Sequence, residues 1–170
     1  MKTRYKLALI AIIASLSLKV SFGAADALLQ PSYLADMKET SAKVGFSEFM
    51  TSKILKERKM TVCGEIPRHG LYAHAASTVI YDLAGTGASW LKGSVGLEDG
   101  QWGKVQFIVF GDDKELWRSP VVMKERREAN PKKIRFEVGI RGVKTLKLVV
   151  DALGSREHDH SVWVDPQIGK

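Results

Sequence analysis

Apolar and polar residues alternate along most of this chain. In residues 134–140 every second residue is apolar, and residues 146–150 repeat the pattern after a short Arg141-Gly142 turn. A strand points successive side chains to opposite faces, so this alternation gives each segment one buried and one solvated face. We therefore expect two strands that pair as a hairpin.

Further strands are expected in segments with the same period or with runs of β-branched and aromatic residues. These segments are 43–49, 61–63, 77–83, 90–97, 104–110, 115–118 and 162–168. Glycine and aspartate turns at 85–87, 99–100 and 111–113 separate several of them. A short helix is expected at 24–29, before Pro31. About nine or ten short strands without a long helix predict an all-β fold, a two-sheet antiparallel β-sandwich or jelly roll.

The first residues have the pattern of a signal peptide. Lys2, Arg4 and Lys6 precede an apolar run over 7–18, and small residues follow it. Cleavage after residue 23 or 25 would fit, and the run is shorter than the roughly 20 residues of a membrane-spanning helix. An uncleaved anchor is the alternative. We expect a signal peptide at 1–25, an N-terminal segment at 26–33, a single domain at 34–168, and a secreted or periplasmic protein without a membrane span.

The charge of the expected mature chain is modest. The whole sequence has 26 basic and 19 acidic residues, but four of the basic residues lie before residue 26. The mature chain would then have a net charge of +3, which argues against nucleic acid as a partner. Its single cysteine, Cys63, cannot form an internal disulfide and is interpreted as a small buried side chain, with an intermolecular disulfide or a reactive thiol as alternatives.

Three segments hold more polar and aromatic residues than a sandwich requires, namely 69–74, 98–102 and 151–165. The sequence His158-Asp159-His160 suggests metal ligands, but no third histidine or cysteine completes a transition-metal site within the run. Carboxylates in a glycine-containing loop suit Ca²⁺ better. A small hydrolase using residues 157–160 is a further alternative, although the sequence contains no Gly-x-Ser-x-Gly motif.

Trp163 allows two interpretations. On a strand it shares a face with Ser161 and Asp165, while Val162 and Val164 take the other face. An exposed indole beside hydrogen-bond acceptors is typical of sugar sites. The alternative is a buried indole whose N–H is bound by Asp165.

Six motifs in order resemble the NPCBM domain, a carbohydrate-binding module seen with glycoside hydrolase family 98 and some α-galactosidases. The motifs are GLYAHA (70–75), STVIYDL (77–83), VGLED (95–99), VQFIVFGD (105–112), VKTLKLVVD (143–151) and DHSVWVD (159–165). They cover about residues 34–168. The chain departs from the family at Tyr72, at 161–162 and in the loop 155–157, where a change could alter sugar specificity while the fold is kept.

This resemblance implies a galactose-binding-like jelly roll related to family 51 carbohydrate-binding modules, which bind galactose-containing glycans and can hold a structural Ca²⁺. It implies two sets of site residues: His74, Glu98, His160 and Trp163 for the sugar, and Asp99, Asp151, Asp159 and Asp165 for calcium. The expected function is that of an exported, non-catalytic module that binds glycans through a loop-end site. A structural or protein-interaction sandwich that has lost sugar binding is the alternative.

Overall fold

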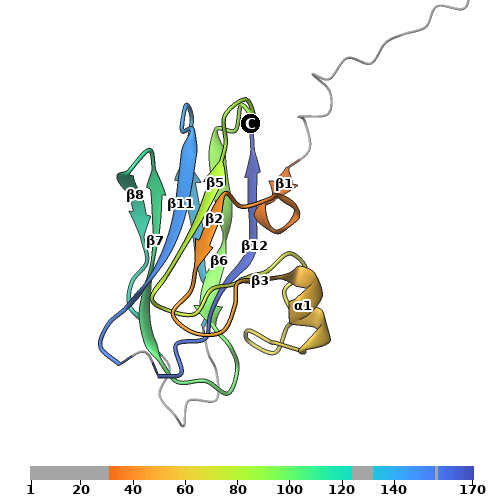
Figure 1. Cartoon of the computed structure of the whole chain (residues 1–170), viewed down its shortest axis with the longest axis vertical. Coiled ribbons are helices and arrows are strands. Elements are labelled where there is room, and N and C mark those ends of the chain that lie inside the picture. Colours follow the sequence, from red (N-terminus) through yellow and green to blue (C-terminus); the bar gives the residue numbers. More distant parts are fainter. Residues whose placement is uncertain (1–30, 124–131, 156) are drawn as a thin grey trace, which may run out of the picture.

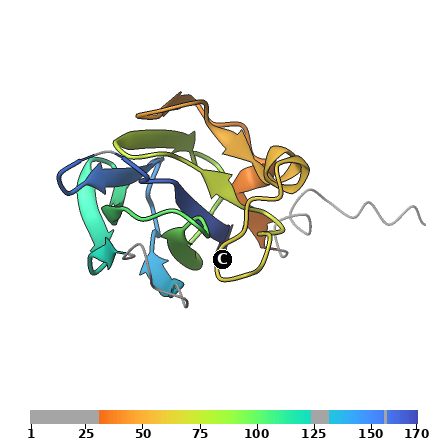
Figure 2. The ribbon, with the colours of Figure 1, turned by 90° about the horizontal axis from the view of Figure 1, so that it is seen from below.

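The computed structural model describes residues 31–123, 132–155 and 157–170. Two antiparallel sheets lie face to face in this part of the chain, as Figures 1 and 2 show. The helical elements are the 3-10 turn η2 (Leu34–Asp36) and the short helix α1 (Ser52–Glu57). In the described part, no helix combines the length and the apolar character that a membrane crossing requires.

The first sheet is built around β6 and β12, which pair along almost their full length. Its strand order is β10-β6-β12-β4-β3, with β1 also paired to β12. The strands are β1 (Ser32–Tyr33), β3 (Met50–Thr51), β4 (Leu71–Tyr72), β6 (Trp90–Leu97), β10 (Ile134–Gly139) and β12 (Ser161–Gly169). The register of β12 against β6 shifts between Val164 and Gln167, where Asp165 has a φ of +49°.

The second sheet has the order β2-β5-β11-β7-β8, with β9 also paired to β7. Its strands are β2 (Ser41–Lys43), β5 (Ser77–Asp82), β7 (Lys104–Gly111), β8 (Lys114–Arg118), β9 (Val122–Met123) and β11 (Thr145–Ala152). Alternate residues of β11 are buried, as its period-two pattern predicts. The two inner faces meet in one core that includes Val95, Phe107, Leu148 and Trp163.

A second apolar cluster covers part of the outer face of the first sheet. The segment that contains α1 lies beside β3 and β12 (Figure 1) and packs Leu55, Met60 and Val62 on Val162 and Val164. Burying these side chains stabilises the fold by about 1.5–3 kcal/mol each. Both faces of β12 are therefore buried over 161–164, because the core covers one face and this segment covers the other.

The expected hairpin between 134–140 and 146–150 is wrong. β10 pairs with β6 in the first sheet, whereas β11 pairs with β5 and β7 in the second. The Arg141-Gly142 turn therefore carries the chain from one sheet to the other.

Two of the expected strands are also wrong. Residues 43–49 are mostly a loop between β2 and β3, and 61–63 form only an isolated bridge between Val62 and Glu65. The predicted signal peptide and the helix at 24–29 lie outside the described residues.

Candidate functional site

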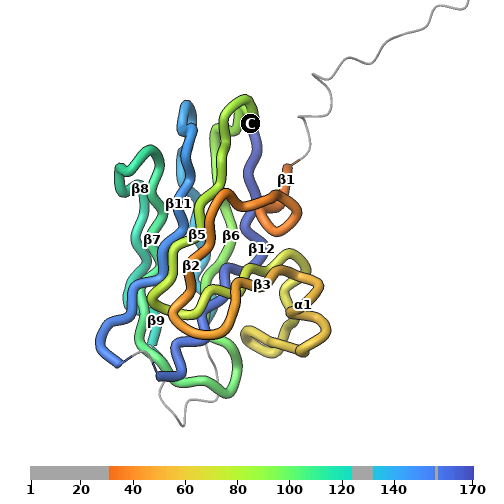
Figure 3. Tube along the Cα trace, in the orientation of Figure 1, coloured from red at the N-terminus to blue at the C-terminus, as the bar shows by residue number. Residues whose placement is uncertain are grey.

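Four loops gather at one end of the sandwich, drawn at the bottom of Figures 1 and 3. They are residues 44–49, 73–76 and 98–103, together with the described residues 153–155 and 157–160. Backbone hydrogen bonds join them: the N–H of Ala75 donates to the carbonyl oxygen of Asp159 over 3.3 Å, and that of Glu98 donates to His160 over 2.8 Å. These hydrogen bonds hold the loop backbones against one another, which reduces the cost of ordering the loops when a ligand binds.

The loop 44–49 brings an aromatic ring to this end. The N–H of Gly45 donates to the carbonyl oxygen of His74 over 3.0 Å, and a Cβ at residue 45 would clash with the carbonyl of Ala75. Glycine therefore permits this close approach. The next residue, Phe46, is 64% exposed, and the centroid of its ring lies 5.6 Å from that of His74.

His74 and His160 meet edge to face at the loop end, with their ring centroids 5.1 Å apart. The Nδ1 atom of His74 lies 2.7 Å from the carbonyl oxygen of Ala75. The Nδ1 atom of His160 lies 2.9 Å from a carboxylate oxygen of Glu98. Since both partners are acceptors, Nδ1 carries the proton in each ring, and Nε2 is the acceptor whenever the ring is neutral.

These side chains border an open pocket of about 520 Å³ lined by Gly45, Phe46, His74, Glu157, His158 and His160. This volume lies within the range of about 300–1,000 Å³ that is usual for ligand sites. His158 stacks on Trp102 at a centroid distance of 3.6 Å, and its Nδ1 lies 3.0 Å from the side-chain oxygen of Gln101. The pocket thus combines an exposed apolar ring with three imidazoles and the Glu157 carboxylate, which suits a ligand that has both apolar faces and hydroxyls.

Asp159 organises the loops beneath this pocket. Its carboxylate is buried and accepts the N–H of Lys104 over 2.9 Å, and a Cβ at Gly103 would clash with it. Desolvation raises the pKa of the Asp159 carboxyl, while the Lys104 N–H and the neighbouring histidines oppose that rise. Burial, together with the Glu98 carboxylate, raises the pKa of Tyr72 to about 12, so this phenol stays protonated at neutral pH.

The four carboxylates expected to bind calcium do not form one cation site. Asp99 accepts the N–H groups of Cys63 and Gly64, Asp165 accepts the N–H of His69, and Asp159 lies under the pocket. Asp151 is exposed on β11. Within the described residues, no group of three or more histidine, cysteine, aspartate or glutamate side chains is placed to hold a metal ion. The prediction that these four carboxylates together bind calcium is therefore wrong, and calcium binding itself stays a prediction.

The prediction that Trp163 contacts the sugar is also wrong. Its side chain is 0% exposed and forms edge-to-face contacts with Phe107 and Phe136, at centroid distances of 5.1 and 5.7 Å. The indole points into the core, and the segment containing α1 closes the opposite face of the strand. Trp163 therefore has no surface on which a sugar could stack.

The structure brings His74, Glu98 and His160 together, although they lie far apart in the sequence. Glu98 does not line the pocket, but its carboxylate contacts the His160 imidazole that does. The sequence interpretation missed Phe46, because 43–49 was expected to be a strand. The signal that could have identified it is the sequence Gly45-Phe46-Ser47, an aromatic residue between two residues typical of turns.

The sequence profile of the NPCBM/NEW2 domain matches residues 30–169, so the chain belongs to this family. A search among curated proteins finds no match. Among solved structures, the chain is similar to the family 51 module of the Clostridium perfringens GH95 enzyme in complex with methyl-galactose. That similarity has a TM-score of 0.67 and 24% identity, and covers 82% of this chain and 99% of the other.

Two further structures share the fold. The second family 51 module of C. perfringens ZmpB, solved with GlcNAc and INT domains, has a TM-score of 0.67 and 24% identity, and the match covers 83% of this chain and 32% of that one. The tandem modules of the family 98 enzyme of Streptococcus pneumoniae SP3-BS71 have a TM-score of 0.65 and 17% identity, with 82% and 46% covered. This chain thus spans about a third of the ZmpB structure and about half of the tandem structure. These similarities establish a carbohydrate-binding-module fold.

Proposed function

We propose that this protein is an exported, non-catalytic carbohydrate-binding module that recognises a galactose-type glycan through the loop-end pocket. The observation that carries the proposal is the exposed ring of Phe46 beside His74 and His160 in that pocket. An aromatic ring covers the apolar C–H face of a sugar, and the imidazoles exchange hydrogen bonds with its hydroxyls. The GH95 module was solved with methyl-galactose, which makes galactosides the first ligands to test.

The alternative is a sandwich that has lost sugar binding and serves structure or protein interaction. Its supporting observation is that His74, Asp159 and Trp163 are all buried. The pocket that adjoins His74 favours the binding function instead. Export rests on the signal-peptide pattern of the sequence.

Isothermal titration calorimetry with methyl β-D-galactopyranoside and with GlcNAc tests the proposal. Phe46→Ala should weaken binding about tenfold, because about 50 Å² of buried apolar contact contributes about 1.3 kcal/mol. Val121→Ala is the matched control, since Val121 is also exposed and apolar but does not line the pocket. If a folded sample does not bind methyl β-D-galactopyranoside, whether or not it binds GlcNAc, galactose-type recognition is contradicted. Equal galactoside affinities of Phe46→Ala and Val121→Ala would contradict the loop-end site.

A further inference from the structure

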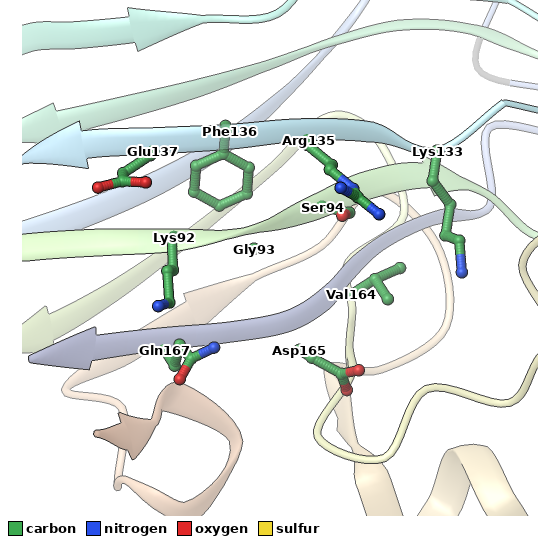
Figure 4. A pocket seen from close by; sticks show the side chains of 10 residues that line it. All are labelled: Lys92, Gly93, Ser94, Lys133, Arg135, Phe136, Glu137, Val164, Asp165 and Gln167. Carbon is green, nitrogen blue, oxygen red and sulfur yellow. The ribbon is translucent and has the colours of Figure 1, made fainter. Parts of the chain in front are cut away.

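A second hollow of about 610 Å³ lies away from the loop end, on the outer face of the first sheet. It lies next to the part of this face that the segment containing α1 covers. Its floor is formed by β10, β6 and the part of β12 where the register shifts (Figure 4). At its centre Ser94 pairs in register with Arg135 on one side and with Val164 on the other. The hollow exists because the side chains of Gly93, Ser94 and Val164 on its floor are absent or short, while those at its border are long.

The border is rich in hydrogen-bond donors. Lys133 and Arg135 extend from the β10 side, Lys92 extends from β6, and Gln167 extends from β12 (Figure 4). Lys133 is paired with Glu65 over 2.6 Å. In the described part of the chain, neither Arg135 nor Lys92 forms an ion pair, and the Lys92 ammonium lies 4.4 Å from the ring centroid of Trp90. Among the described residues, these two cations therefore have no acidic partner.

Two acidic side chains, Asp165 and Glu137, also line the hollow, but among the described residues neither forms an ion pair with Arg135 or Lys92. Asp165 uses one carboxylate oxygen to accept the N–H of His69 over 2.7 Å. Glu137 is the register partner of Lys92, but the two do not form an ion pair. The Arg135 guanidinium keeps all five of its donors unpaired among the described residues, and its planar shape suits two oxygens of one anionic group.

An adjoining hollow of about 450 Å³ extends the surface past Arg68 and Ile66. It shares Lys133, Val164 and Asp165 with the first, so the two hollows lie side by side and are together called the groove. The first hollow alone has the volume of an ordinary small-ligand site, and the second adds room for a further unit of a chain.

We propose that this groove is a second binding site that takes an acidic saccharide, meaning a sugar with a carboxylate or sulfate group. Arg135 and Lys92 bind the anionic group, while Ser94 and Gln167 bind hydroxyls above the short side chains of the floor. The choice of a saccharide rests on the proposed function, whereas the choice of an anion rests on the unpaired cations.

Backbone amide NMR shifts test this site with methyl β-D-glucuronide and methyl β-D-glucoside, which differ only at C6, where the first has a carboxylate and the second a hydroxymethyl group. At matched ionic strength, the glucuronide should shift the amides of Ser94, Arg135 and Gln167, and the glucoside should leave them unchanged. Arg135→Gln should weaken the glucuronide response about fivefold, the upper range for an exposed ion pair. Arg141→Gln, which removes another exposed arginine, should leave it unchanged.

Equal shifts with both glycosides, or no shift at this face, would overturn the proposal. Sodium sulfate serves as a third probe. Equal amide shifts with sulfate and with the glucuronide would mean that the groove binds any small anion, and this result would overturn the saccharide assignment. In Phe46→Ala the response of Ser94 to glucuronide should persist. If Phe46→Ala loses galactoside binding but keeps the Ser94 response to glucuronide, the two sites act independently. The proposed loop-end site and the proposed groove site can therefore fail separately.

Discussion

Replacing Trp163 with phenylalanine should weaken the fold without weakening ligand binding. The substitution removes roughly 40 Å³ from the core, which costs about 1 kcal/mol at about 24 cal/mol per Å³. The loss of roughly 40 Å² of buried apolar surface adds about 1 kcal/mol. The indole N–H is buried without a hydrogen-bond partner among the described residues, and removing it recovers up to about 1 kcal/mol. The net destabilisation is therefore about 1–2 kcal/mol.

This loss should appear as a fall in Tm of about 3–7 °C for a domain of about 140 residues. Differential scanning calorimetry measures the Tm, and titration with methyl β-D-galactopyranoside at a temperature where both proteins are folded measures affinity. Phe46→Ala should weaken galactoside binding while the Tm stays nearly unchanged. Its side chain is 64% exposed, so the substitution should change the free energy of unfolding by no more than about 0.5 kcal/mol. Loss of galactoside binding in Trp163→Phe at unchanged Tm would refute the assignment of this indole to the core.

Two further predictions concern pH and metal. Burial raises the pKa of the Asp159 carboxyl in the folded protein above its ordinary value of 3.8. The folded state therefore binds this proton more tightly than the unfolded state does. The contribution of Asp159 to the free energy of unfolding then falls as the pH rises from 3.8 through the pKa of the folded state. Asp159→Asn removes this titration, so the Tm of the variant minus that of the wild type should become more positive between about pH 4 and about pH 7. A difference that shrinks over this interval in thermal melts would be incompatible with a raised pKa. If the chain binds a structural calcium ion, as predicted from the sequence, the Tm should fall when EDTA replaces calcium, and identical melting curves in the two buffers would rule this out.

Local periodicity was sufficient to locate most of the long strands. β5, β6, β7 and β11 coincide with expected segments within a few residues, because alternation along a strand directly reflects burial on one face. It could not show which sheet a strand joins. β10 and β11 follow each other with the spacing of a hairpin, yet each finds partners far away in the sequence, and pairing of that kind leaves no local signal.

The site was predictable only in part for a similar reason. His74, Glu98 and His160 stand in motifs that resemble the family, and the structure places them together. Trp163 was ambiguous because its strand has polar neighbours on the face that turns out to point inward. Phe46 reaches the pocket through a backbone contact of Gly45 with His74, which no periodicity predicts.

The most direct test of the central claim is a crystal structure of the protein soaked in methyl β-D-galactopyranoside. The proposed function predicts the sugar in the loop-end pocket, with its apolar face on Phe46 and its hydroxyls near His74 and His160. A galactoside bound on another surface, with this pocket free of sugar, would contradict it.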